Sequence, residues 1–275
     1  MTETTGTHAT ADGLDLFTRS WTIDAPRYDV LLVHGLGEHS GRWSGPAEYL
    51  NNHGASVFSY DLRGHGRSGG KPGDIERFDL FYDDIAEMAI ATAASTGRPW
   101  VLYGHSLGGL QAAGYLINDR EPLPNLAVLS APAMQALRSI DSVLKVAANV
   151  LGTITPGLRL SANVTAEMLS RDPSVGEAYF ADELVQTKVT TRFAKASFSE
   201  QSKLKDRIGS ITTQTLVIHG ADDQLVEPAS SAGLAASAAV QRKVYPGLRH
   251  EMHNEPEAEQ VLGDITDWID RKLAG

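Results

Sequence analysis

Ser106 lies between two glycines, in the segment Gly104-His105-Ser106-Leu107-Gly108. A short apolar run (residues 100–103) precedes this segment, and a helix-compatible stretch (residues 111–116) follows it. A serine at the apex of such a strand–turn–helix needs glycine two positions before and after it, because a Cβ there would collide with the neighbouring strand or helix. The turn exposes the hydroxyl at a helix N-terminus, where the first free N–H, on Leu107, faces a developing oxyanion. The pattern therefore predicts a nucleophilic serine and one oxyanion donor.

Candidates for an acid and a base follow two later apolar runs. Residues 215–218 lead into Gly220-Ala221-Asp222-Asp223, and residues 242–245 lead into Pro246-Gly247-Leu248-Arg249-His250. Ligands of an open α/β sheet bind at the carboxyl ends of its strands, so these side chains are expected near Ser106. The order Ser, Asp, His is the one this kind of serine turn uses for its triad. By position alone, the acid is Asp222 or Asp223 and the base is His250 or His253.

Strands and helices alternate over most of the chain. The sequence predicts strands at residues 7–11, 14–21, 30–33, 55–60, 100–103, 126–129, 215–218 and 242–245. It predicts helices at residues 46–52, at about 78–95, directly after Ser106, and at 257–273. Short continuous apolar runs separated by helices are typical of a parallel sheet covered on both faces. We therefore expect an α/β fold with a mostly parallel central sheet of about eight strands and helices on both faces.

The alternation stops between residues 131 and 213, where helical patterns appear without a strong strand signal. The clearest of them puts five apolar residues on one face of a helix: Leu137, Ile140, Leu144, Ala147 and Leu151. We interpret residues 131–199 as a helical cap inserted into a core formed by residues 1–130 and 200–275. The apolar face of this helix either covers the core or, in part, lines an acyl-chain tunnel and contacts lipid.

The composition excludes several classes of function. The 275-residue chain has no cysteine, which excludes disulfides, thiolate metal sites and a cysteine nucleophile. Its formal net charge of −10 disfavours nucleic acid as a partner, because phosphate contacts need clustered Lys and Arg. No apolar stretch reaches the roughly 18 residues of a membrane span, and residues 1–10 lack a signal-peptide pattern. We expect a cytoplasmic protein that contacts membrane or lipid surfaces peripherally.

Six segments, taken in order, resemble the monoacylglycerol lipases of the α/β-hydrolase superfamily, especially the bacterial ones. They are His34-Gly35-Leu36-Gly37-Glu38-His39-Ser40-Gly41-Arg42, Asp61-x-Arg63-Gly64-His65-Gly66-x-Ser68, Gly104-His105-Ser106-Leu107-Gly108-Gly109, Arg171-Asp172-Pro173, Gly220-x-x-Asp223-x-x-Val226 and Tyr245-Pro246-Gly247-x-x-His250-Glu251-x-x-Asn254-Glu255. The serine turn is common to many hydrolases, whereas the first segment is far more specific. The resemblance spans nearly the whole chain and is weakest in the cap. It implies an α/β-hydrolase fold and a serine esterase that cleaves monoacylglycerols to fatty acid and glycerol through an acyl-enzyme, without a cofactor.

The resemblance also selects among the neighbouring candidates. Its Gly-x-x-Asp-x-x-Val pattern makes Asp223 the acid, and its Pro-Gly-x-x-His pattern makes His250 the base for Ser106. It makes the backbone N–H of Leu36 the second oxyanion donor, beside that of Leu107.

Four further side chains become candidates for substrate contact. Tyr179 matches a cap tyrosine that hydrogen-bonds the glycerol end in these lipases, although Glu183 stands where the family's Tyr-x-x-Asp-Pro-Leu has proline. Glu38 and Arg42 either orient their loop through an ion pair or contact a polar head group. His105 either orders its loop through a hydrogen bond or contacts the substrate.

Other functions were weighed against this one. A general carboxylesterase or thioesterase would keep the same triad and differ in its cap pocket, whereas a non-catalytic binding protein on this fold would not need an intact triad. Gly64-x-Gly66-x-x-Gly69 matches a dinucleotide fingerprint, but it continues into Gly70-Lys71-Pro72, which cannot open a helix. The chain has no His-Glu-x-x-His motif. We therefore predict no metal, no cofactor and no nucleic acid, and a small lipid ester as the partner.

Overall fold

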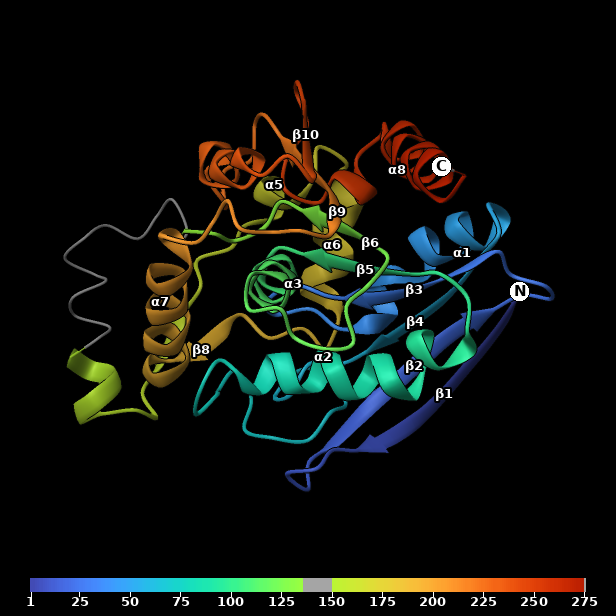
Figure 1. Ribbon diagram of the computed structural model, residues 1–275. Helices are drawn as coiled ribbons and strands as arrows, with labels where there is room; N and C mark the ends of the chain where they lie inside the picture. Colours follow the sequence, from blue (N-terminus) through green and yellow to red (C-terminus); the bar gives the residue numbers. More distant parts are fainter. Residues whose placement is uncertain (136–149, 275) are drawn as a thin grey trace.

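Among the described residues, eight strands form a central sheet in the order β1-β2-β4-β3-β5-β6-β9-β10 (Figure 1). The structure is a computed structural model that describes residues 1–135 and 150–274. Strand β2 is antiparallel to both of its neighbours, and all pairs from β4 to β10 are parallel. The bounds are β1 Thr2–Ala9, β2 Asp15–Thr22, β3 Tyr28–Val33, β4 Ala55–Tyr60, β5 Trp100–His105, β6 Leu126–Ser130, β9 Gln214–Gly220 and β10 Val240–Tyr245. The expected mostly parallel α/β-hydrolase sheet is confirmed.

The central strands are apolar on both faces because helices cover both. In β3, Val30 and Leu32 pack with one cluster, which holds residues of α1 and α8, while Leu31 and Val33 pack with the other, which holds residues of α2 and α3. This is the period-two alternation of a strand, with neither face left to water. The helices are α1 Ser44–Asn52, α2 Leu80–Ala91, α3 Leu107–Ile117 and α8 Ala258–Leu273, with 3-10 turns η1 Ser40–Trp43, η2 Ala93–Thr96, η3 Pro228–Ala236 and η4 Met252–Asn254. Figure 1 shows α2 on the face opposite α1 and α8.

The strand order contains a reversal that positions the site. The chain passes outward from β3 to β4 and then returns to place β5 on the other side of β3. Two connections that leave neighbouring strands in opposite directions open a crevice at the carboxyl ends of those strands. The loop after β3 begins at His34, and the turn after β5 holds Ser106, so both lie at this crevice.

The described part of the cap contains short elements: β7 Arg159–Ser161, α5 Ala166–Leu169, α6 Pro173–Ala181, β8 Lys188–Thr190 and α7 Thr191–Lys205. Strands β7 and β8 form a separate antiparallel pair that the sequence analysis did not predict, because three residues are too few to show a periodic pattern. Helix α7 runs without a break through residue 199, where we expected the cap to end, and it contacts α3 of the core.

Some expectations about the cap fall outside the described residues. Leu137, Ile140, Leu144 and Ala147 of the expected amphipathic helix lie in the stretch 136–149. Leu151 lies in a short helical stretch at 150–154 and is half-buried. Within residues 1–135 and 150–274, no helix combines the length and the apolarity needed to cross a membrane.

Candidate active site

Ser106 occupies a backbone conformation that few non-glycine residues adopt, with φ 53° and ψ −113°. It directly precedes α3, and its N–H donates to the carbonyl of Ser130 on β6. A Cβ at Gly104 would lie 2.8 Å from the Cβ of Ala112, and a Cβ at Gly108 would overlap the carbonyl of Val33. These two glycines therefore allow strand β5 and helix α3 to meet at the sharp angle that presents the serine.

Two later loops bring an imidazole and a carboxylate to this serine. Oγ of Ser106 lies 2.9 Å from Nε2 of His250, and Nδ1 of His250 lies 2.7 Å from Oδ2 of Asp223. The side chain of Asp222 is exposed to solvent, and only its backbone N–H is described as hydrogen-bonded, to the carbonyl of Leu248. The structure thus brings together Ser106, His250 and Asp223, and it leaves Asp222 outside the cluster.

The neighbouring histidine, His253, has a different environment. Its ring stacks on Trp43 with centroids 4.0 Å apart, and burial lowers its pKa to about 3. An imidazole held neutral and stacked in this way fills space beside the site. His250, and not His253, carries the hydrogen bond to Ser106.

The charges around His250 favour its protonated form. Burial acts to lower the pKa of His250, but the charge and hydrogen bond of Asp223, with further help from Glu251 and Glu38, raise it above the ordinary value. Burial acts to raise the pKa of Asp223, and the charge of His250 with hydrogen bonds from His219 and His250 outweighs it, so that this pKa lies far below its usual value. A base that takes a proton next to a carboxylate that stays ionised is the electrostatic arrangement needed to activate a hydroxyl.

Leu36 and Leu107 lie next to the serine in the structure and are the candidate oxyanion donors. Leu107 is the first residue of α3, so its N–H has no acceptor within the helix. Leu36 follows Gly35, at which a Cβ would lie only 3.1 Å from the Cβ of Ser106. The loop can pass this close because Gly35 has no side chain and because its N–H donates to Oε1 of Glu38 at 2.6 Å. The two N–H groups belong to the loops after β3 and β5, at the crevice.

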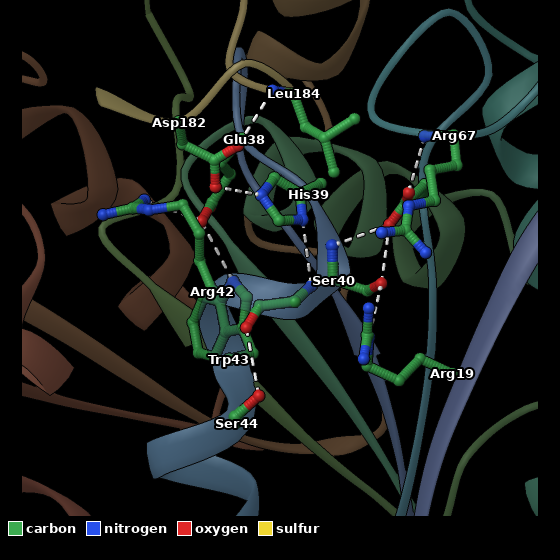
Figure 2. Close-up of polar contacts among 12 residues, drawn as sticks. Arg19, Glu38, His39, Ser40, Arg42, Trp43, Ser44, Arg67, Asp182 and Leu184 are labelled. Atoms are coloured by element: carbon green, nitrogen blue, oxygen red, sulfur yellow. Dashed lines mark hydrogen bonds and ion pairs between the residues drawn. The ribbon is translucent and has the colours of Figure 1, made fainter. Parts of the chain in front are cut away.

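Glu38 and Arg42 belong to an ion-pair network that fixes this loop (Figure 2). Oε2 of Glu38 accepts from Nη1 of Arg42 at 3.0 Å and from Nε1 of Trp43 at 3.1 Å. Arg42 also binds Glu251 through two hydrogen bonds of 2.8 Å. Since Glu251 directly follows His250, Arg42 joins the loop after β3 to the loop of the base. Burial and the negative charge of Glu251 raise the pKa of Glu38. Burial also acts to raise the pKa of Glu251, but the charge and hydrogen bonds of Arg42 outweigh it and hold this pKa at about 2.

The same loop is attached to the cap. Nε2 of His39 lies 2.8 Å from Oδ2 of Asp182, and Nδ1 of His39 accepts from the N–H of Gly41 at the start of η1 (Figure 2). The N–H of Gln186 donates to the carbonyl of Gly37 at 2.9 Å. The cap turn that follows α6 therefore rests directly on the loop that carries Leu36.

Tyr179 of α6 is buried beside this network, with its ring 4.8 Å from the guanidinium carbon of Arg42. His105, also buried, lies 3.2 Å through Nδ1 from the hydroxyl of Ser130 and packs against the ring of His250. Tyr179, His105 and Glu38 all line the cavity at Ser106, whereas Arg42 is not among the described residues that line it. Glu38 and Arg42 form the ion pair that was expected to orient their loop. Glu38 also lines the cavity that a substrate would enter.

The cavity at Ser106 is small, about 40 Å³, and is bounded by these described residues: Gly35, Leu36, Glu38, His105, Ser106, Ala162, Val164, Leu169, Tyr179, Gln186, Thr187, Leu225, His250 and Glu251. Such a volume holds a few water molecules. Its charged and histidine side chains come from the loops of the core, whereas the cap contributes apolar residues such as Val164 and Leu169 together with the polar residues Tyr179, Gln186 and Thr187.

Three residues of this arrangement were missed from the sequence. His219 contacts Asp223, Glu251 holds Arg42, and Asp182 holds His39. Glu251 stands inside a resembling segment and Asp182 inside the Tyr-x-x-Asp-Pro-Leu pattern around Tyr179, so a signal was present. Pairing between residues this far apart along the chain nevertheless has no local pattern. His219 ends the strand before Asp223, which makes it a neighbour of the acid once the strand is placed.

Within residues 1–135 and 150–274, no group of three or more His, Cys, Asp or Glu side chains is arranged to hold a metal ion. What the arrangement can do with its own groups is nucleophilic attack by a hydroxyl, with a base, an ionised acid and backbone donors in place.

Comparisons with known proteins agree with the fold. The chain matches the family model described as "Serine aminopeptidase, S33" (Hydrolase_4) over residues 24–257. It is 40% identical over 256 residues to a monoacylglycerol lipase of Mycolicibacterium smegmatis, with 90% of each chain covered. It is 30% identical to the human monoglyceride lipase over 275 residues, which cover 96% of this chain and 89% of the human one. The solved monoacylglycerol lipase of Paleococcus ferrophilus matches with a TM-score of 0.83 at 29% identity, covering 94% of this chain and 99% of that one.

Proposed function

This chain belongs to the serine aminopeptidase S33 family of the α/β-hydrolase superfamily, and from that membership we propose that it hydrolyses monoacylglycerols to a fatty acid and glycerol. The observation that carries the proposal is the hydrogen-bonded series Ser106, His250 and Asp223 at the base of a cavity walled by core loops and the cap. Relatives named monoacylglycerol or monoglyceride lipase support the choice of substrate class.

The proposed mechanism uses the groups of this chain alone. Oγ of Ser106 attacks the ester carbonyl as Nε2 of His250 takes its proton, and the N–H groups of Leu36 and Leu107 stabilise the resulting oxyanion. Collapse of the intermediate breaks the bond to the glycerol oxygen, which receives the proton from His250. Water then attacks the acyl-enzyme with His250 as its base, and the acid leaves as Ser106 is restored.

The two walls of the cavity suggest how a monoacylglycerol is oriented. Glu38, Tyr179 and His105 give a polar side that suits the hydroxyl groups of glycerol, while Val164, Leu169 and Leu225 give an apolar side that suits an acyl chain. The cavity of about 40 Å³ at Ser106 accommodates only the part of the substrate next to the ester, so a long acyl chain extends beyond it. We retain a general carboxylesterase or thioesterase as the alternative, with the same triad acting on another small acyl ester.

We further propose that the cap contacts lipid surfaces, with residues 131–199 acting as a unit over the core of residues 1–130 and 200–275. Four large apolar side chains of the described cap are exposed: Val150, Ile154, Leu158 and Phe180. Contact with a membrane or lipid droplet would bury them, and it would bring the cavity close to substrates that are poorly soluble in water. This fits a cytoplasmic protein bound peripherally to lipid.

A hydrolysis panel tests the proposed substrate class. The purified protein and its Ser106→Ala variant are given long-chain monoacyl-, diacyl- and triacylglycerols, a short p-nitrophenyl ester, an acyl thioester and an aminoacyl anilide. We expect the highest kcat/KM on the monoacylglycerol and less than about 1% of that rate in the variant. A preference for the thioester or the short ester would favour the alternative, and a preference for the anilide would favour the peptidase chemistry after which the family is named.

A further inference from the structure

Asp223 contacts a second histidine that the proposed mechanism does not use. His219, at the end of β9, has no exposed surface, and its Nε2 lies 3.1 Å from Oδ2 of Asp223 and 3.3 Å from the carbonyl of Val226. This Oδ2 is the same oxygen that receives the hydrogen bond from His250. On the other side of the ring, Nδ1 of His219 lies 3.1 Å from Oγ of Ser231.

The partners of His219 define which nitrogen carries the proton. Nε2 faces two acceptors, so it must be the N–H, and Nδ1 must then accept from the hydroxyl of Ser231. Oγ of Ser231 has one proton and two acceptors within reach, Nδ1 of His219 and the carbonyl of Pro228 at 3.0 Å. We assign this proton to Nδ1, because the carbonyl already accepts from Nη2 of Arg242 at 2.6 Å, whereas the buried Nδ1 would otherwise lack this donor. Nε of Arg242 in turn donates to Oγ of Ser231 at 3.1 Å. Nε of Arg242, Oγ of Ser231 and Nε2 of His219 therefore donate one to the next and finally to Asp223.

We propose that His219, with Ser231 behind it, is a positioning residue for Asp223 and keeps this carboxylate ionised and correctly oriented while His250 carries the proton. Oδ1 of Asp223 accepts from the N–H groups of Leu225 and Val226 at 2.8 and 2.9 Å, and Oδ2 accepts from the two histidines. Four donors fix the plane of the carboxylate, and a satisfied anion competes less for the proton on His250. The inference rests on the proposed function, since it assigns a role within the same triad.

Removal of His219 has a predictable effect on pH dependence. The titratable groups that face His250 are Asp223, Glu251, Glu38, His105 and His253, and those that face His219 are Asp223, His105 and, through Ser231, Arg242. Without the donor of His219, the carboxylate of Asp223 has one hydrogen bond fewer and stabilises the protonated form of His250 more strongly. The pKa of His250 therefore rises, and the acid limb of kcat/KM moves to higher pH.

The test compares two replacements of His219. Leucine removes the donor, whereas the side-chain amide of glutamine offers an N–H at a similar reach. We expect His219→Leu to lower kcat on a short p-nitrophenyl ester about tenfold and to raise the acid limb by about one pH unit. KM should stay unchanged, because His219 is not among the residues that line the cavity. His219→Gln should restore most of the lost kcat and return the acid limb close to its original pH. A purely structural role of His219 does not predict this recovery.

A second pair of variants decides the question even if His219→Leu does not fold. Ser231→Ala removes the donor to Nδ1, and Ser230→Ala removes a neighbouring buried hydroxyl that has no partner among the described residues. We expect a severalfold lower kcat and a raised acid limb for Ser231→Ala only. The inference would be overturned if Ser231→Ala and Ser230→Ala had the same kcat and the same acid limb of kcat/KM. It would also be overturned if His219→Leu folded and kept the pH profile of the unmodified protein. If the unmodified protein cleaves no ester, or if Ser106→Ala cleaves it equally well, the proposed function itself has failed.

Discussion

Asp222 and Asp223 are adjacent in sequence and opposite in environment. Asp223 is fully buried and its carboxylate accepts hydrogen bonds from two backbone N–H groups and two histidines, whereas Asp222 faces solvent. The residue types alone left both open as the acid, and only the spacing shared with a known family chose between them. Ser106 was easier to identify, because the glycines that permit its turn are its immediate neighbours.

A pair of amide substitutions tests the assignment of the acid. Asp223→Asn should lower kcat by about three to four orders of magnitude, because an amide facing Nδ1 of His250 favours the wrong tautomer. Asp222→Asn serves as the matched control and should change kcat less than about twofold, since solvent surrounds that side chain. Steady-state kinetics on a p-nitrophenyl ester measures both. A larger loss in Asp222→Asn would mean that the acid has been assigned to the wrong residue.

The elements of the core were predictable because each carries its own pattern. Strands such as β3 and β5 contain continuous apolar runs and end in polar or glycine-rich loops, and α8 shows a clear helical period. Strand β1 is the exception, because it was expected at residues 7–11 and is formed by the mostly polar stretch Thr2–Ala9. The elements of the cap were less predictable from the sequence. Strands β7 and β8 are only three residues long, and α7 continues past the boundary expected at residue 199. The position of the cap over the core depends on tertiary contacts such as the one between His39 and Asp182, and no local sequence pattern predicts such contacts.

The contact between the cap and the loop of Leu36 should affect turnover. Asp182→Ala removes the acceptor for His39, and the loss of about 1 kcal/mol of hydrogen bonding should lower the melting temperature by about 2–4 °C. We also expect kcat to fall severalfold, because the loop that supplies one oxyanion donor becomes less firmly held. The neighbouring exposed residue gives the control, Glu183→Ala. Identical melting temperatures and kcat values in the two variants would show that this contact does not position the loop.

Across the whole molecule, several histidines are buried in the neutral form. Burial lowers the pKa of His34 to about 3, of His65 to about 4 and of His253 to about 3, and the pKa of His105 is also well below its ordinary value. The sequence showed nine histidines but could not show their burial, because burial follows from how the loops after β3, β4, β5 and β10 meet. The order of strands and helices did predict the fold class, since this order is read from local patterns and needs no knowledge of which loops touch.

The buried histidines predict a loss of stability in mild acid. Their folded-state pKa values lie below the unfolded value of about 6.5, so the unfolded chain binds more protons as the pH falls from 7 toward 4. At pH 5 each of His34, His65 and His253 should cost about 2 kcal/mol, which together is a large part of a domain's stability. His250, with a raised pKa, acts in the opposite direction. Urea unfolding at pH 7.5 and pH 5 measures the sum, and an equal or higher midpoint at pH 5 would contradict it.

The central claim is that Ser106 takes the acyl group from a monoacylglycerol. Rapid-quench mass spectrometry of the protein mixed with a long-chain monoacylglycerol tests it directly, because it reports the covalent intermediate and the residue that carries it. We predict a mass increase of one acyl group that maps to the peptide containing Ser106, formed as glycerol is released, and no such increase in Ser106→Ala. Release of glycerol by Ser106→Ala at the rate of the unmodified protein, or an acyl group on a different residue, would contradict the account.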